Sequence, residues 1–139
     1  MKHKYTGKSL LELREKFGIG GKGFYSQSWY LNEPFAKEKA PKGTYEIDFT
    51  KQLTKLTLDQ QKEKLPKGFD FPHPAVLIEA VLEHYKKTGE RLLENWWSRT
   101  LVQSSDGYSV LVGRFVSGGL SVRYDSRDAA TSDLGVCPS

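Results

Sequence analysis

Five arginines in the second half of the chain are the side chains best suited to directed contacts. They are Arg91, Arg99, Arg114, Arg123 and Arg127, and only two lysines accompany them after residue 68. An arginine guanidinium makes planar, bidentate contacts and stacks on aromatic rings. This part of the chain therefore has the chemistry of recognition.

The candidate catalytic groups do not combine into a recognisable active site. Asp106 lies near Tyr108, and Glu90 and Glu94 have helical spacing, but carboxylates four residues apart are usually solvated surface groups. Cys137 has no histidine close in sequence, which favours a small buried thiol over a nucleophile. Because no nucleophile, base and orienting group come together, we expect that the protein is not an enzyme, and catalysis is the less favoured interpretation.

A disulfide, a metal centre and a cofactor are not expected either. The single cysteine excludes an internal disulfide and a multi-cysteine zinc site. The three histidines, His3, His73 and His84, are too scattered for a metal-ligand spacing. His73 precedes a predicted helix, where a capping role is favoured, and His84 lies among polar neighbours. We therefore predict no metal and no cofactor.

The length and composition indicate one folded domain. The chain has 139 residues, of which 12% are aromatic, more large rings than a core of this size needs. No apolar run approaches the roughly 18 residues of a membrane span, and residues 1–8 contain no hydrophobic signal-peptide core. As written, the sequence predicts a cytoplasmic protein with no membrane span, and it leaves export by another route open.

Charge is distributed unevenly along the chain. Residues 1–68 contain 14 lysines and arginines against 8 acidic residues, whereas residues 69–139 contain 7 against 9. Lysines spread between helix and loop signals are typical of a solvated surface. The alternative is a nucleic-acid-binding module in which the lysines contact phosphates and Trp29, Tyr25 and Tyr30 stack on bases. Self-association through exposed aromatic residues is also open.

Three helices are predicted from their end signals. These signals are capping boxes, a first-turn proline, and glycine or proline stops. In chain order they are Ser9 with Glu12 and Gly18, Thr57 with Gln60 and Pro66, and Pro74 with Gly89. The third segment has one broad apolar face, so we expect it to be a core helix.

Three further segments come before the second of these helices. The glycines at positions 18, 20, 21 and 23 lack the lysine-then-serine or threonine ending of a phosphate loop, and this predicts a flexible connection. The aromatic segment 24–35 is expected to pack on the core. Tyr45, Ile47 and Phe49 alternate with acidic residues, which predicts a half-buried strand.

The pattern changes to a period of two after Glu94. Residues 96–102, 107–116 and 120–124 predict an antiparallel sheet, with a tight turn at 117–119. The polar loop 125–133 is well placed to present side chains before a closing strand at 134–136. We therefore expect an α+β single domain over residues 1–139, with short N-terminal helices and a C-terminal antiparallel sheet. Its lysine-rich N-terminal part is residues 1–64, and the core helix and sheet lie in residues 65–139.

Residues 65–139 also resemble a C-type lectin-like domain. The resemblance rests on LP at 65–66, FPHP at 71–74, WWSRT at 96–100, where bacterial members often have Trp-Ser-Ser-Thr, and LGV at 134–136. Within that superfamily the chain is most similar to the variable proteins of diversity-generating retroelements. This resemblance implies a C-type lectin-like fold and a binding scaffold rather than an enzyme.

The resemblance also implies a set of site residues and a class of ligand. Ligand contacts in the variable proteins come from the C-terminal strands and loops. The matching positions here are Trp97, Arg99, Tyr108, Arg114, Arg123, Tyr124, Asp125, Ser126, Arg127 and Asp128. They would form one recognition face for a protein, a peptide or a glycan. The structural alternative is that the two rings Trp97 and Tyr108 are core residues and that the charged residues are solvated strand edges.

The chain departs from the sugar-binding members of that superfamily in one respect. The calcium-dependent signatures Glu-Pro-Asn and Trp-Asn-Asp are absent, since the nearest match, at residues 32–34, has the wrong order and place. We therefore predict no lectin-type calcium site.

Overall fold

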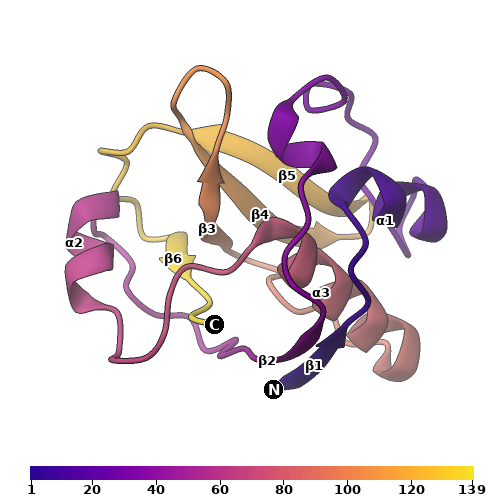
Figure 1. Cartoon of the computed structure of the whole chain (residues 1–139), viewed down its shortest axis with the longest axis horizontal. Helices are drawn as coiled ribbons and strands as arrows, with labels where there is room; N and C mark the ends of the chain where they lie inside the picture. The colour runs from indigo at the N-terminus through magenta and orange to yellow at the C-terminus, as the bar shows by residue number, and fades with distance from the viewer.

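Three α-helices, one short 3-10 helix and six β-strands make up the fold in the computed structural model, which describes residues 1–139 (Figure 1). In chain order the elements are β1 (Lys2–Tyr5), α1 (Leu10–Phe17), η1 (Pro34–Lys37), β2 (Gly43–Glu46), α2 (Leu58–Lys64), α3 (Pro74–Thr88), β3 (Trp97–Gln103), β4 (Ser109–Val116), β5 (Gly119–Asp125) and β6 (Leu134–Val136). The strands form two sheets, so the predicted α+β class is confirmed. None of the helices is both long enough and apolar enough to cross a bilayer.

The three predicted helices begin at their predicted caps. Both Ser9 and Thr57 accept a hydrogen bond from the third helical amide, and the side chain at that third position bonds back to the cap. His73 Nδ1 accepts a hydrogen bond from the Ala75 amide at the start of α3. Gly89 ends α3 in the left-handed conformation, with φ at 75°. Local end signals therefore set all three helices.

The larger sheet has the strand order β5-β4-β3-β6. As predicted, β3, β4 and β5 are antiparallel neighbours, but β6 pairs with β3 in parallel, with Leu134 opposite Trp97. The prediction of a fully antiparallel sheet is therefore wrong for the last strand. The reason is that residues 126–133 lead from the end of β5 to the beginning of β3, so β6 starts at the same end as β3.

One face of this sheet packs against α3, and α1 packs against α3 in turn. Val110, Val112 and Val122 from the sheet lie in the same buried cluster as Tyr5 and Cys137. Burial of a side chain of this size stabilises the fold by about 1.5–3 kcal/mol. The core therefore includes residues from both the lysine-rich part and the C-terminal sheet.

The smaller sheet joins β1 and β2, which are antiparallel and pair over Lys2–Tyr5 and Gly43–Glu46. The predicted strand around residues 45–49 is thus displaced toward the N-terminus. Just after Glu46 the backbone contacts the C-terminal segment, because the Asp48 amide donates to the Pro138 carbonyl oxygen. Figure 1 shows both termini beside this segment.

A buried carboxylate connects β1 to α3. Glu79 of α3 has no solvent exposure, and its Oε1 lies 2.7 Å from His3 Nε2 of β1. The same carboxylate accepts hydrogen bonds from the amide and the hydroxyl of Thr6. Buried charges are tolerated when they are hydrogen-bonded in this way.

The glycine-rich segment 18–23 packs against the sheet instead of forming a flexible connection. The Leu120 amide of β5 donates to the Gly23 carbonyl oxygen, and Arg91 Nη1 donates to that of Gly21 at 2.8 Å. A Cβ on Gly21 would lie 2.5 Å from the carbonyl oxygen of Ser117. The prediction of flexibility is wrong because these glycines allow a close backbone approach to the β4–β5 turn.

The aromatic segment 24–35 packs on the core, as predicted. Phe24, Tyr30 and Phe35 are buried in the main cluster. The Trp29 ring lies 5.7 Å from the rings of both Tyr30 and Phe35 and is partly exposed.

Candidate binding surface

The ten predicted site residues do not share one face of the larger sheet. Successive strand residues point to opposite faces, and in β5 Arg123 is opposite Leu111 whereas Tyr124 is opposite Val110. Val110 belongs to the core on the α3 side, so Tyr124 is on that side as well. Arg123 is on the opposite side, which we call the outer face. The expectation of a single recognition face is therefore wrong.

Residues 126–133 cross the outer face and cover part of it. Ala129 packs against a buried cluster of Trp97, Leu111 and Leu134. Trp97 is only 6% exposed, and the Arg123 guanidinium lies 5.3 Å from the centre of its ring. The indole Nε1 of Trp97 is buried without a hydrogen-bond partner. Trp97 is thus a core residue, which was the structural alternative for this position.

Arg99 is fully buried beneath the same loop and holds it in place. Its Nη2 donates to the carbonyl oxygens of Ser126, Arg127 and Ala129 at 3.0, 3.2 and 3.1 Å. Its Nη1 donates to Gln61 Oε1 of α2 at 2.8 Å. The predicted surface position of Arg99 is therefore wrong: its donors face acceptors inside the protein.

The acceptors around Arg99 are neutral. Besides the loop carbonyls and Gln61, they include Ser109 Oγ, 3.2 Å from Nε. Burial lowers the pKa of the guanidinium from its ordinary value, and the charges of Asp125 and Asp128 oppose this effect. Arginine keeps its charge in proteins, so Arg99 is a buried cation held by protein oxygens in place of water.

The exposed arginines on the outer face and its loop each contact an aspartate. The pairs are Arg114 with Asp133 at 2.9 Å, Arg123 with Asp125 at 3.1 Å, and Arg127 with Asp59 at 3.4 Å. A hydrogen bond from Thr131 and the neighbouring Arg114 hold the pKa of Asp133 below its ordinary value. These arginines are therefore already paired within the chain, and a ligand would have to compete with the aspartates.

Tyr108 and Tyr124 form an exposed aromatic surface at the rim of the α3 side. Their ring centres lie 5.4 Å apart, and the Trp29 ring lies 4.9 Å from that of Tyr124. Tyr108 is 42% exposed and Tyr124 is 48% exposed. Trp29 Nε1 donates to the Val122 carbonyl oxygen at 2.8 Å, which fixes the indole behind the tyrosines. We call Trp29, Tyr108 and Tyr124 the aromatic edge.

A cavity of about 220 Å³ opens beside the aromatic edge. Its lining combines two rings with carboxylates and hydroxyls: Trp29, Glu33, Ser104, Ser105, Asp106 and Tyr124. The Ser105 amide donates to Glu33 Oε1 at 3.0 Å, so the wall of the cavity is internally bonded. Ring faces next to directed acceptors can contact the apolar face of a ligand and bind its hydroxyl or amino groups.

Sequence reasoning did not associate Trp29 and Glu33 with this site. Trp29 was placed in an aromatic layer on the core or, in the nucleic-acid alternative, among the base-stacking rings, and Glu33 was considered only within residues 32–34, which do not match a calcium signature. No local pattern relates them to Tyr124, because their segment reaches β5 through tertiary packing. The only usable signal was the excess of rings over the needs of the core.

The candidate catalytic groups are dispersed. Glu90 Oε1 lies 2.6 Å from His84 Nε2 on the surface, while Asp106 lies at the cavity beside the aromatic edge. Cys137 is buried, and this burial raises the pKa of its thiol far above the ordinary value. No three His, Cys, Asp or Glu side chains gather where they could hold a metal ion.

Comparisons of the chain with protein-family models, with curated proteins and with solved structures find no match. The interpretation of the aromatic edge therefore rests on its own geometry.

Proposed function

We propose that this chain is a non-catalytic recognition domain that binds a protein, peptide or glycan ligand at the aromatic edge. The observation that carries the proposal is the pair of half-exposed rings, Tyr108 and Tyr124, at the ends of two paired strands and backed by Trp29. Rings held in this way lose little conformational freedom when they are covered, and tyrosine offers both apolar area and a hydroxyl.

The remaining exposed residues of the predicted site would make peripheral contacts with a ligand bound at the aromatic edge. Asp125 and Ser126 follow Tyr124 directly, and Arg123 and Arg127 are engaged by aspartates. We therefore assign the main contact to the rings and the acceptors beside them, and a peripheral role to the paired arginines.

We further propose that the domain has a C-type lectin-like fold and is related to the variable proteins of diversity-generating retroelements. The order of core helix, strand, hairpin, polar loop and closing strand on which the resemblance rests is present from α3 to β6. The parallel pairing of β6 departs from the antiparallel sheet that we expected with it.

Nucleic-acid binding by the lysine-rich part is the competing function, and the rings offered for it are mostly engaged. Tyr30 is fully buried, and Trp29 is held behind Tyr124. Of the three rings, Tyr25 is the most exposed, at 44%, and Trp29 is partly exposed. Base stacking needs accessible ring faces, so we treat this function as an outcome of the test below.

The test is a binding screen of the full chain against protein, peptide, glycan and nucleic-acid panels at low and high salt. We expect a salt-tolerant ligand whose affinity falls about tenfold or more in Tyr124→Ala and in Tyr108→Ala. Tyr25→Ala is the matched control, because Tyr25 has similar exposure and lies outside the aromatic edge. Thermal unfolding verifies that each variant is folded.

Two results would contradict the proposal. One is a ligand that binds equally well to all three tyrosine variants. The other is a chain that binds only nucleic acid, with an affinity that falls steeply as salt rises.

A further inference from the structure

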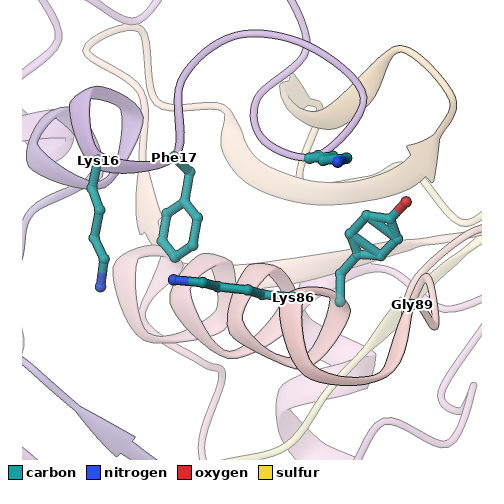
Figure 2. Close-up of a pocket in the computed structure, with 6 residues that line it drawn as sticks. Lys16, Phe17, Lys86 and Gly89 are labelled. Atoms are coloured by element: carbon teal, nitrogen blue, oxygen red, sulfur yellow. The ribbon is translucent and has the colours of Figure 1, made fainter.

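A second cavity lies between the C-terminal turns of α1 and α3. Its volume is about 510 Å³, and it is lined by Lys16 and Phe17 of α1, Lys22 of the glycine-rich segment, and Tyr85, Lys86 and Gly89 of the α3 end. Figure 2 shows the Phe17 ring and the Lys86 side chain reaching toward one another from the two helices. A volume of this size is in the range of small-molecule sites.

This cavity is separate from the aromatic edge. The aromatic edge lies at the end of β4 and β5 where Ser109 pairs with Asp125. The cavity lies toward the other end of these strands, because Lys22 in its lining follows Gly21, which packs against the β4–β5 turn at Ser117. The link to that turn is Arg91, which donates to the carbonyl oxygens of both Gly21 and Val116. A ligand in one site therefore does not contact the other.

The charged groups that line the cavity are all ammonium groups. Lys16 contacts Glu83 at 3.1 Å, whereas Lys22 and Lys86 make no ion pair. The two helix C-termini bring partial negative charge to the same place. That charge is reduced because the Gly18 and Gly89 amides donate to the carbonyl oxygens of Arg14 and Tyr85. Two unpaired cations beside one opening therefore favour an anion.

The walls of the cavity are aromatic, and one of them is braced. The Arg91 guanidinium lies 4.5 Å from the centre of the Tyr85 ring, and its Nη2 donates to the Tyr85 hydroxyl at 3.2 Å. Phe115 packs edge-on against Tyr85 at 5.1 Å. Phe17 supplies the second ring, partly buried on the opposite helix. Flat apolar groups contact such rings favourably.

The segment that carries Lys22 is also held in place. The Gly20 amide donates to the Phe24 carbonyl oxygen at 2.8 Å, and the Gly23 amide donates to that of Gly20 at 2.9 Å. This tight turn is the glycine cluster that lacks the ending of a phosphate loop. Its backbone packs on the β4–β5 turn, and its lysine side chain faces the cavity.

We infer that the cavity between α1 and α3 binds a small aromatic phosphate, with the flat ring against Phe17 and Tyr85 and the phosphate between Lys22 and Lys86. Nucleoside monophosphates and simple aryl phosphates share this chemistry. The two unpaired ammonium groups match the charge of one phosphate dianion.

The experiment is a titration of the full chain, followed by NMR amide shifts and calorimetry, with four probes: adenosine monophosphate, phenyl phosphate, adenosine and inorganic phosphate. We expect adenosine monophosphate or phenyl phosphate to bind with a Kd of about 1 mM or tighter. We also expect shifts at the Gly18 and Gly89 amides, and weaker binding of adenosine and phosphate alone. Preference for one of the first two probes identifies the source of the ring.

Variants locate the site. The double variant Lys22→Gln, Lys86→Gln should weaken the phosphate ester about tenfold or more, while Lys64→Gln, which removes an exposed and unpaired lysine from α2, should leave it unchanged. Tyr124→Ala should also leave it unchanged, so a failure here is distinguishable from a failure at the aromatic edge. The inference is overturned if neither phosphate ester binds, if inorganic phosphate binds as tightly as the esters, or if the double variant behaves like the Lys64 control.

Discussion

The arginines of the C-terminal half and the lysines of the N-terminal half use their charges in opposite ways. Arg91 and Arg99 donate to backbone carbonyl oxygens, and the other three C-terminal arginines each contact an aspartate. Among the 13 lysines of residues 1–68, only Lys16 and Lys39 contact a carboxylate. Arginine, with five donors in a planar fork, connects segments of this chain, whereas most of the lysine ammonium groups are solvated at its surface.

This difference changes what an external partner would meet. The charge of the C-terminal half is largely neutralised inside the molecule, so a ligand there meets rings and acceptor oxygens. Most of the lysines in the N-terminal half make no ion pair, and Lys22 brings one of these charges to the cavity between α1 and α3, where Lys86 of the C-terminal half adds a second. Arginine content alone is therefore a poor guide to the recognition surface.

Arg99→Met gives the largest expected effect, because Arg99 is the one arginine that is fully buried. Methionine replaces the unbranched aliphatic stem of the arginine but not its guanidinium. The carbonyl oxygens of Ser126, Arg127 and Ala129 therefore lose their donor. We expect the free energy of unfolding to fall by about 3 kcal/mol or more, because buried acceptors lose their partners. Denaturant unfolding measures this loss, and hydrogen exchange should show faster exchange over residues 126–133. A loss below about 1 kcal/mol would mean that other contacts hold the loop.

His73 differs from the arginines, because it is a basic side chain that the fold favours as neutral. Burial lowers the pKa of its imidazole from the ordinary value of 6.5, and Nδ1 accepts the Ala75 amide bond. The unfolded chain then takes up the proton at higher pH than the folded chain. Stability is therefore complete above the ordinary value and decreases as pH falls below it.

The matched variant is His73→Asn, which keeps a capping acceptor that does not titrate. Between pH 7 and pH 5 we expect the wild-type chain to lose up to about 1 kcal/mol more than this variant, the typical contribution of one helix cap, since protonation removes the cap and puts a cation at a helix N-terminus. The other histidines are present in both chains and cancel in the difference. Parallel stability profiles for the two proteins would contradict the assignment.

The smallest effects are expected from the exposed arginine–aspartate pairs. Arg114→Ala, Arg123→Ala and Arg127→Ala should each change the free energy of unfolding by less than about 1 kcal/mol, because solvent screens these pairs. Denaturant unfolding at low and high salt checks this expectation. A larger loss for Arg123 alone would show that its contact with the Trp97 ring matters more than its ion pair.

The sequence could predict features whose causes are local. The capping residues Ser9, Thr57 and His73 act on amides two or three positions away, so their helices could be located before the structure was known. The hairpin of β4 and β5 was predictable for the same reason, since its glycine turn and alternating pattern are contiguous.

Features that depend on distant partners could not be predicted. Arginine is usually a surface residue. The burial of Arg99 depends on carbonyl oxygens of residues 126–129 and on Gln61 of α2. The parallel strand β6 follows from the same crossing loop. In the site, Tyr108 and Tyr124 were identified, whereas their neighbour Trp29 became apparent only through tertiary packing.

The way Arg99 holds the crossing loop has a consequence for which sequences the loop tolerates. Its bonds go to main-chain carbonyl oxygens, which every residue type possesses, and the side chains of Arg127, Asp128 and residues 130–132 are exposed. Anchorage and side-chain identity are therefore largely independent over this stretch. A library of substitutions at these exposed positions would keep the same attachment to the sheet, so the loop is a place where the surface chemistry of this domain can be rewritten while its backbone path is preserved.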